Sequence, residues 1–514
     1  MSASNTKRIA KNTLMLYFRQ ILIMLVSLYT VRVVLETLGA EDYGLYNVVA
    51  GIVTMFNFLS GALATASQRY FSFDLGRKDF EQLKKTFSVS FISYILITVI
   101  IVLLAESLGL WYVHTRLKIN PERVFAARII YQTSIVSLAF TVMTSPYMAA
   151  IIAHEDMSIY AYVSILEVSL KLLLVFLLPI LGSDRLIVYG LLMMAVVIIN
   201  TTVYRTICRK KYEETKAGWI WDRKLFREIM SFTGWNIFGA STSLFRIQAL
   251  NIVLNQYFNP IVIAARSIAN QVNTAVSTFA QNFSTAVRPQ IIKSYASDNK
   301  EEMESLVYRS CKLTFGLMFV FTLPLYFEMD YVLGLWLKEV PEWAILFTRL
   351  VLLDTLIDSV NFPLKSAAQA TGKIKIYQIV VGSIRIANFP ISLIFLQFFN
   401  TPVVIFYIAL VLTFTSLVAR LIIIKNLVGF KLTKILKKVF LPLIIAASLS
   451  FICIAKIHIH LGSGFVKLLL TTSISVFTWG LLFLVVVLSK KEKQSILLLV
   501  KTKINEISIK TRNK

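Results

Sequence analysis

The sequence is poor in the residues on which most enzymes and metal sites depend. It has three cysteines and four histidines in 514 residues, and only 16% of its residues are charged. The cysteines, Cys208, Cys311 and Cys453, are odd in number and lack CxxC spacing, so they indicate neither a disulfide framework nor a zinc site. The HExxH, GxSxG and GxxxxGK[ST] motifs are all missing. We therefore expect no enzymatic activity, no metal and no cofactor.

His458 and His460 form an H-x-H pair that could hold a metal with further ligands. A short external turn explains the pair more simply, because no other ligand accompanies it.

What the sequence has in abundance is apolar side chains. They make up 57% of the residues, and the mean hydropathy is +0.70, outside the range of soluble globular proteins. Apolar runs of about 20 residues recur along the chain, each long enough to cross a hydrocarbon core of about 30 Å. We predict an all-α polytopic membrane protein with about fourteen transmembrane helices. The predicted spans are residues 13–35, 43–67, 87–112, 125–153, 159–181, 186–207, 228–254, 261–285, 306–328, 342–370, 376–398, 402–425, 439–457 and 464–488.

The formal net charge of +25 is concentrated in short loops and tails on one side of these spans. An excess of Lys and Arg marks cytoplasmic loops, so we expect both termini in the cytoplasm and no nucleic-acid partner. The basic tail, residues 489–514, is either a solvated charged segment or an amphipathic segment on anionic lipid.

Two parts of the chain resemble each other. The segments "SPYMAAIIAHEDMSIY" and "FPLKSAAQATGKIKIY" superpose at one constant offset, which pairs Pro146 with Pro363 and Tyr160 with Tyr377. A nearly equal offset places "DLGRKDFEQL" on "SYASDNKEEM". Internal repeats are common in transporters, and six helices per repeat would keep both halves in the same orientation.

The repeat divides the chain into lobes. We predict a six-helix N-terminal lobe at 1–207, a six-helix C-terminal lobe at 208–425, two additional helices at 426–488, and the tail.

The eighth predicted span carries a polar stripe. Arg266, Asn270, Asn273, Ser277 and Ser284 recur at helical spacing on one face. A charge at the bilayer centre costs about 2.5–3.5 kcal/mol or more, so this face should meet protein or a water-filled cavity. Amides that join neighbouring helices are the alternative explanation.

The tenth predicted span carries Asp354, Asp358, Asn361 and Lys365 on one face. The stripe is consistent with an ion or proton site at Asp354 and Asp358. It is equally consistent with an acidic pair neutralised by Lys365 and a nearby arginine.

Arginines outnumber carboxylates within the predicted spans. The arginine fork suits phosphate and carboxylate oxygens, so an internal cavity should attract anions.

The segment "LGAEDYGLYNVVAGIVTMFNFLSGALATASQRYFSFDLGRKD" resembles polysaccharide flippases of the multidrug/oligosaccharidyl-lipid/polysaccharide (MOP) exporter superfamily, in particular the Wzx-type O-antigen branch. The likeness lies in Gly39, Tyr43 and Gly44, where the chain enters the second span, and in Gly61, Ala66 and Arg69, where it leaves that span.

The resemblance implies two six-helix lobes in a V, MATE-like, with alternating access across a bacterial inner membrane. It implies a polyprenyl-diphosphate-linked oligosaccharide as substrate, an O-antigen or capsule repeat unit, and contacts with membrane lipids and the polysaccharide polymerase machinery. By position, the expected substrate-binding residues are Arg19, Arg32, Arg246 and Arg266, with Asn270 and Asn273 on the stripe.

Two other transport functions remain open. A peptidoglycan lipid-precursor flippase would share fold, charge and lipid carrier. A MATE-type multidrug or cation antiporter would need an acidic or aromatic cavity, and the arginine excess disfavours it.

Overall fold

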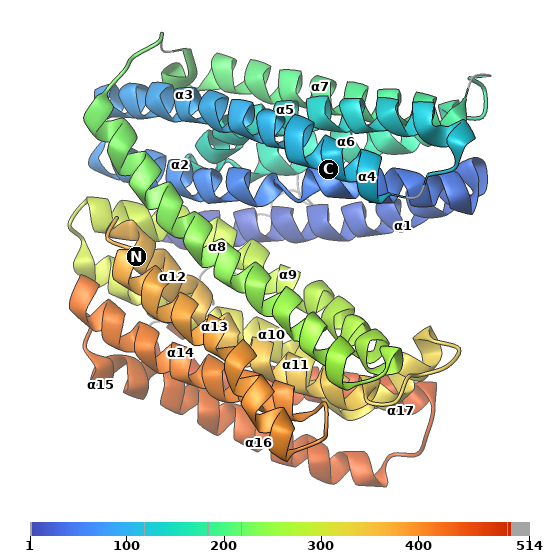
Figure 1. Ribbon diagram of the computed structural model, residues 1–514. Helices are drawn as coiled ribbons and strands as arrows, with labels where there is room; N and C mark the ends of the chain where they lie inside the picture. Colours follow the sequence, from blue (N-terminus) through green and yellow to red (C-terminus); the bar gives the residue numbers. More distant parts are fainter. Residues whose placement is uncertain (1–2, 118, 182–183, 217, 491, 495–514) are drawn as a thin grey trace, which may run out of the picture. The chain divides into compact units, whose positions relative to one another are not determined.

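The computed structural model describes residues 3–117, 119–181, 184–216, 218–490 and 492–494 (Figure 1). Every regular element in these ranges is helical, which confirms the predicted fold class. Packing divides the chain into two compact units, residues 12–240 and residues 1–11 with 241–514. The division falls inside one continuous helix, so our boundaries at 207, 425 and 488 stay predictions.

The unit formed by residues 12–240 contains most of α1 and the helices that follow it up to the first half of α8. Their bounds are α1 Ala3–Thr54, α2 Asn57–Arg77, α3 Phe80–Leu104, α4 Leu110–Arg116, α5 Val124–Ala153, α6 Met157–Leu177, α7 Arg185–Lys211 and α8 Arg223–Tyr257. A π-helical turn, Ala105–Gly109, joins α3 to α4.

In its described residues, the unit that contains residues 241–514 holds the rest of α8 and nine further α-helices. Their bounds are α9 Pro260–Ala296, α10 Lys300–Trp336, α11 Ala344–Ser359, α12 Asn361–Ala370, α13 Lys375–Phe398, α14 Val404–Val428, α15 Leu432–Ile435, α16 Leu441–His460 and α17 Phe465–Leu482. π-Helical turns η4, Leu436–Phe440, and η5, Phe483–Val487, precede α16 and follow α17.

Helices cover all fourteen predicted spans, but the first two are joined. Helix α1 runs through both and breaks only at Gly39, whose φ of 79° is left-handed. The second span then continues from α1 into α2 across a 45° bend after Thr54, whose hydroxyl bonds back to the carbonyl of Gly51. The glycine that helped to identify the family resemblance is therefore the residue that ends the first span.

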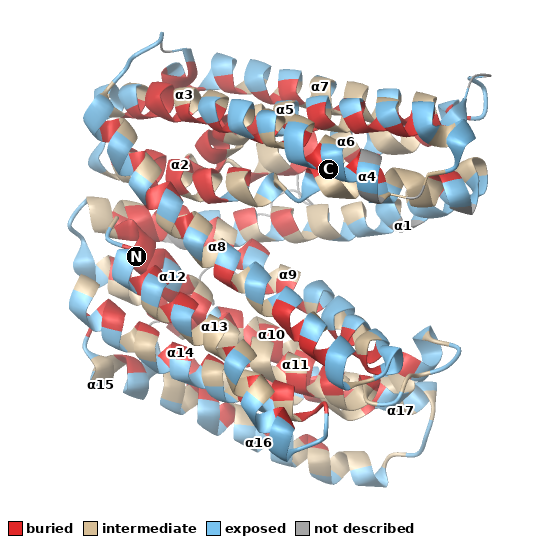
Figure 2. Ribbon diagram, viewed as in Figure 1, coloured by how far each residue is buried: buried red, intermediate tan, exposed pale blue. Residues whose placement is uncertain are grey.

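Length and hydropathy alone select eleven membrane-spanning helices in the described residues, or twelve when the bent pair counts as one. Helix α9 and the broken pair α11 and α12 are the predicted spans that do not qualify. α9 is the helix with the polar stripe, and α11 and α12 are separated at Val360. Figure 2 shows exposed residues along helices of both units, and these include many large apolar side chains, as lipid contact requires.

Small residues allow the helices of the first unit to approach closely. In α5, Ala126, Ala127, Ala149 and Ala150 are buried. A Cβ at Gly190 of α7 would lie only 3.3 Å from a side-chain atom of Ile130 in α5. Close helix packing through small residues replaces the hydrophobic effect as a source of association in lipid.

The predicted sequence repeat reappears in the backbone. Lys78 and Asp298, which the repeat aligns, follow α2 and α9 with left-handed φ angles of 59° and 56°. The next residues, Asp79 and Asn299, both cap the helix that comes after through their side chains. Matching turns at matching positions support a duplication.

A second pair of turns agrees with the other aligned segments. Glu155, after α5, has φ 64°, and the residue aligned with it, Gly372 after α12, has φ 76°. The same left-handed turn is thus made by glutamate in one unit and by glycine in the other.

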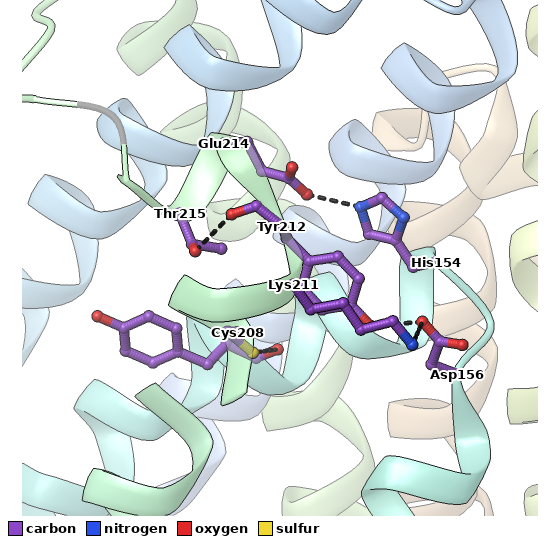
Figure 3. Close-up of polar contacts among 8 residues, drawn as sticks. His154, Asp156, Cys208, Lys211, Tyr212, Glu214 and Thr215 are labelled. Atoms are coloured by element: carbon purple, nitrogen blue, oxygen red, sulfur yellow. Dashed lines mark hydrogen bonds and ion pairs between the residues drawn. The ribbon is translucent and has the colours of Figure 1, made fainter. Parts of the chain in front are cut away.

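A polar cluster surrounds the turn at Glu155 (Figure 3). His154 contacts Glu214 at 2.6 Å and stacks on Tyr212, and the Tyr212 hydroxyl donates to Asp156 at 2.5 Å. Burial raises the pKa of Tyr212, and the hydrogen bond to Asp156 raises it further. Asp156 also pairs with Lys211 at 3.0 Å, so the cluster ties the end of α7 to the α5–α6 turn.

Replacing a glycine by alanine should change the stability of the protein in opposite directions at a left-handed turn and inside a helix. Gly372→Ala should lower the stability of the protein by about 1 kcal/mol, because alanine is strained at positive φ. Gly234→Ala, inside α8 with open space around it, should raise stability by about 0.5–1 kcal/mol. Thermal denaturation of the purified variants measures both, and shifts of the same sign would contradict the argument.

Candidate functional site

The unit of residues 12–240 encloses a polar recess between α1, α5, α6 and α7. Its volume is about 500 Å³, and it is lined by Arg19, Tyr160, Glu167, Lys171 and Asn200 among others. The guanidinium of Arg19 lies 4.5 Å above the centre of the Tyr160 ring, and its Nη1 donates to Ser164 at 3.4 Å. The structure thus places one of the four predicted binding arginines in the wall of a real recess.

Two of the three charged residues in this recess pair with each other, which leaves the positive charge of Arg19 in excess. Lys171 Nζ lies 2.6 Å from Glu167 Oε1, and Asn200 donates to Glu167 Oε2 at 3.0 Å. Glu167 and Lys171 are one helical turn apart, so they neutralise each other within α6.

The unit of residues 241–514 contains a second polar site, which we call the acidic–arginine cluster: Arg246 of α8, Asp354 and Asp358 of α11, Arg385 of α13 and Arg420 of α14. Four of these residues line a small cavity with room for one or two water molecules, and Arg420 borders it through Asp358. The structure brings both predicted ion-coupling residues and one predicted binding arginine to one place.

The two aspartates of the cluster have different environments. Asp358 Oδ1 accepts from Arg420 Nη1 at 3.1 Å and from Asn361 Nδ2 at 2.8 Å, and Arg420 is only 3% exposed. Asp354 Oδ1 is buried and has no hydrogen-bond partner among the described residues. Asp358 therefore neutralises a buried arginine, whereas Asp354, which accepts a hydrogen bond from Thr413 and lies near Arg246, keeps one oxygen available to the cavity.

Arg385 and Arg420 belong to the cluster, although we did not predict them as site residues. Arg385 Nη1 donates to Ser243 at 2.7 Å, and Arg420 lies 5.9 Å from the ring centre of Tyr377. The signal available in the sequence was an arginine within each of two apolar spans, but spacing along α13 and α14 does not reveal which partner it meets.

The remaining predicted binding residues lie elsewhere. Arg32 is largely exposed and pairs with Glu36 at 3.1 Å, which is the i to i+4 spacing seen in the sequence. Arg266 is buried, and its guanidinium donates to Asn251 Oδ1 at 2.6 Å and to the carbonyl of Ile247 at 3.3 Å, both in α8. Asn270 is exposed, and Asn273 has a buried Oδ1 without a partner in the described chain.

A buried carboxylate that the sequence reading overlooked lies in α10. Glu328 accepts from Thr471 of α17 at 2.7 Å and lies 3.0 Å from His458 of α16. The prediction that His458 sits in a turn is wrong, because α16 extends to His460. Within the described residues, no group of three metal-ligating side chains forms.

Comparison with known proteins identifies the family. The model for polysaccharide biosynthesis proteins matches residues 9–297, more than half of the chain, and the MatE model matches residues 237–394. No curated protein matches the chain.

Solved structures share the fold. An outward-facing multidrug resistance MATE family transporter of the MOP superfamily superposes with a TM-score of 0.72 and 13% identity, over 82% of this chain and 96% of that one. The MATE transporter ClbM in complex with Rb⁺ gives 0.69 and 13%, over 83% and 96%. A MOP superfamily transporter from Pyrococcus furiosus, described by the reverse polarity of its binding pocket, gives 0.69 and 13%, over 82% and 96%.

At these identities the structures establish the fold, and the family model, by its coverage, establishes the family. The chain thus belongs to the family of polysaccharide biosynthesis proteins, and its fold is the one seen in MATE transporters.

Proposed function

We propose that this protein is a Wzx-type flippase, which moves a polyprenyl-diphosphate-linked oligosaccharide across a bacterial inner membrane by alternating access. The observation that carries the proposal is the match of the polysaccharide biosynthesis family over residues 9–297. O-antigen or capsule repeat units are the expected cargo, and the polysaccharide polymerase machinery is the expected partner.

The chemistry of the interior agrees with an anionic cargo. The acidic–arginine cluster has three positive charges, on Arg246, Arg385 and Arg420, and two negative charges, on its aspartates. An excess of guanidinium groups at low dielectric favours diphosphate oxygens over organic cations. The recess beside Arg19 adds hydroxyl, amide and aromatic groups of the kind that bind sugars.

A MATE-type cation antiporter is the second candidate. It is favoured by the MatE match at residues 237–394, which includes Asp354 and Asp358. The pairing of Asp358 with Arg420 opposes a metal-cation site at that carboxylate, because a nearby guanidinium already neutralises it.

We retain Arg19, Arg32, Arg246, Arg266, Asn270 and Asn273 as proposed substrate-binding residues, and Asp354 and Asp358 as proposed ion-coupling residues. Arg266 is the residue for which a binding role and a structural role can be separated most directly by experiment, because its structural contacts are limited to two residues of α8.

Arg266→Ala should reduce export per molecule of protein in the membrane at least tenfold, which corresponds to a lost charge-assisted contact of about 1.4 kcal/mol or more. Asn251→Ala is the matched control, since it removes the partner of Arg266 but leaves the guanidinium. We expect that variant to keep most of its activity. The measurement is surface polysaccharide divided by membrane abundance.

Equal losses of export in both variants, or equal losses of membrane abundance, would show that Arg266 only holds α8 and α9 together. Arg266→Lys should restore part of the activity if charge matters more than the guanidinium fork.

Substitution of Asp354 should affect transport, whereas substitution of Asp358 should affect stability. Asp354→Asn should abolish the dependence of transport on an ion gradient with little loss of protein, because asparagine keeps a side-chain oxygen that can accept the hydrogen bond from Thr413. Asp358→Asn should destabilise the protein by about 3–5 kcal/mol, because it leaves Arg420 buried without a counter-charge.

Adding Arg420→Gln to Asp358→Asn should recover membrane abundance. Gradient-driven transport by Asp354→Asn at the normal rate would remove that residue from ion coupling.

We also propose that both termini face the cytoplasm. Reporter fusions after Lys514 and between Leu461 and Gly464 should report opposite sides of the membrane, because α17 separates the two points and the basic loops set the orientation. The same side for both fusions, or a C-terminus outside the cell, would overturn the orientation.

A further inference from the structure

A large cavity lies beside α10, at the end of the spans that carries the lysine-rich loops. Its volume is about 630 Å³, and it is formed by the first part of α10, by α15 and η4, and by the chain that leaves η5. It is separate from the acidic–arginine cluster and is not part of the proposed transport site.

Four basic side chains line the cavity, Arg309, Lys312, Lys434 and Lys438, against three acidic ones, Glu301, Glu304 and Glu492. Lys312, only 5% exposed, lies 3.0 Å from Glu492, and Arg309 lies 3.5 Å from the same carboxylate. Two cations thus share one carboxylate. Lys434 pairs with Glu304 on the opposite wall, and Lys438 adds a further ammonium.

Glu492 remains ionised in this environment. Burial alone would raise the pKa of Glu492, but hydrogen bonds from Ser489 and the charge of Lys312 bring it below its ordinary value. Ser489 and Glu492 form a reciprocal capping box, with the Ser489 N–H donating to Glu492 at 2.7 Å and the Glu492 N–H donating to the Ser489 hydroxyl at 3.4 Å. The carboxylate is therefore fixed between Lys312 and Arg309.

The remaining wall is apolar and continuous with the lipid-exposed helices. Pro442 of α16 and Val486, Val487 and Leu488 at the end of η5 line the cavity on this side. The two helices concerned qualify as membrane spans. Both π-helical turns, η4 and η5, border the cavity, and such turns are frequent at functional sites.

We propose that this cavity binds the phosphate headgroup of an anionic phospholipid, with Lys438, Arg309 and Lys312 around the phosphate and the acyl chains along Pro442 and Val486. Basic pockets between transmembrane helices are suited to such headgroups. Phosphate chemistry could also come from free inorganic phosphate, but the apolar wall and the position at the end of two spans favour the lipid.

The test uses the purified full-length protein in phosphatidylcholine nanodiscs with an increasing fraction of phosphatidylglycerol. Thermal denaturation reports stabilisation, and native mass spectrometry reports retained lipid. Lys438→Ala should weaken the phosphatidylglycerol effect about fivefold, as expected for the loss of one basic group near anionic lipid.

Lys437→Ala is the matched control. Lys437 is adjacent in η4, is exposed and has the same charge, but it does not line the cavity. It should leave the effect nearly unchanged, and Lys438→Arg should preserve it.

Three outcomes would overturn the proposal. Equal effects of Lys437→Ala and Lys438→Ala would indicate diffuse surface attraction. An equal, Lys438-dependent stabilisation by inorganic phosphate without phosphatidylglycerol would identify a free-phosphate site. Equal stabilisation and equal lipid retention in phosphatidylglycerol and phosphatidylcholine would show that the cavity does not bind an anionic headgroup. None of these outcomes bears on which substrate the transporter moves.

Discussion

The absence of water inside a bilayer is the constraint on which the rest of this structure depends. Backbone groups must bond within their own helix, which is why the described chain is helical almost throughout. Hydroxyl side chains within the spans follow the same rule: Thr30, Ser93 and Thr98 donate to carbonyls one turn earlier. Charges have no such local solution, because a guanidinium or carboxylate needs a partner from another helix or a hydrated cavity.

Helix α10 shows how that constraint organises the C-terminal helices. Lys312 meets Glu492 near one end, and Glu328 meets Thr471 and His458 further along the helix. Between these contacts the Trp479 indole donates to the carbonyl of Gly316 at 3.0 Å. A Cβ at Gly316 would lie 2.7 Å from the Phe483 ring, so glycine is required for this approach. The helices beyond residue 428 are therefore bound to α10 by specific polar contacts.

Aligned helices of the two units carry different polar side chains, hydroxyl groups in the first unit and carboxylates in the second. In α5, Thr144 bonds to Thr201 at 2.7 Å, and the position that the repeat aligns with Thr144 is Asn361, beside Asp358. Uncharged hydroxyls in the first unit satisfy one another, whereas the acidic residues of the second require arginines from α13 and α14. The turns at Glu155 and Gly372 are alike, whereas the side chains at the aligned positions Thr144 and Asn361 differ.

The sequence by itself determined which segments are helices in the membrane, because apolar length and the cost of bare backbone depend only on local composition. It also indicated the repeat and the stripes at Arg266 and Asp354, since helical periodicity places residues on one face. It did not determine what each face meets. That Arg266 bonds to Asn251, that Asp358 neutralises Arg420, and that Glu328 pairs with His458 follow from contacts between different helices. Only the tertiary structure decided these partners, because a charge in a low-dielectric interior is stabilised by whichever group the packing of other helices brings within a few ångströms.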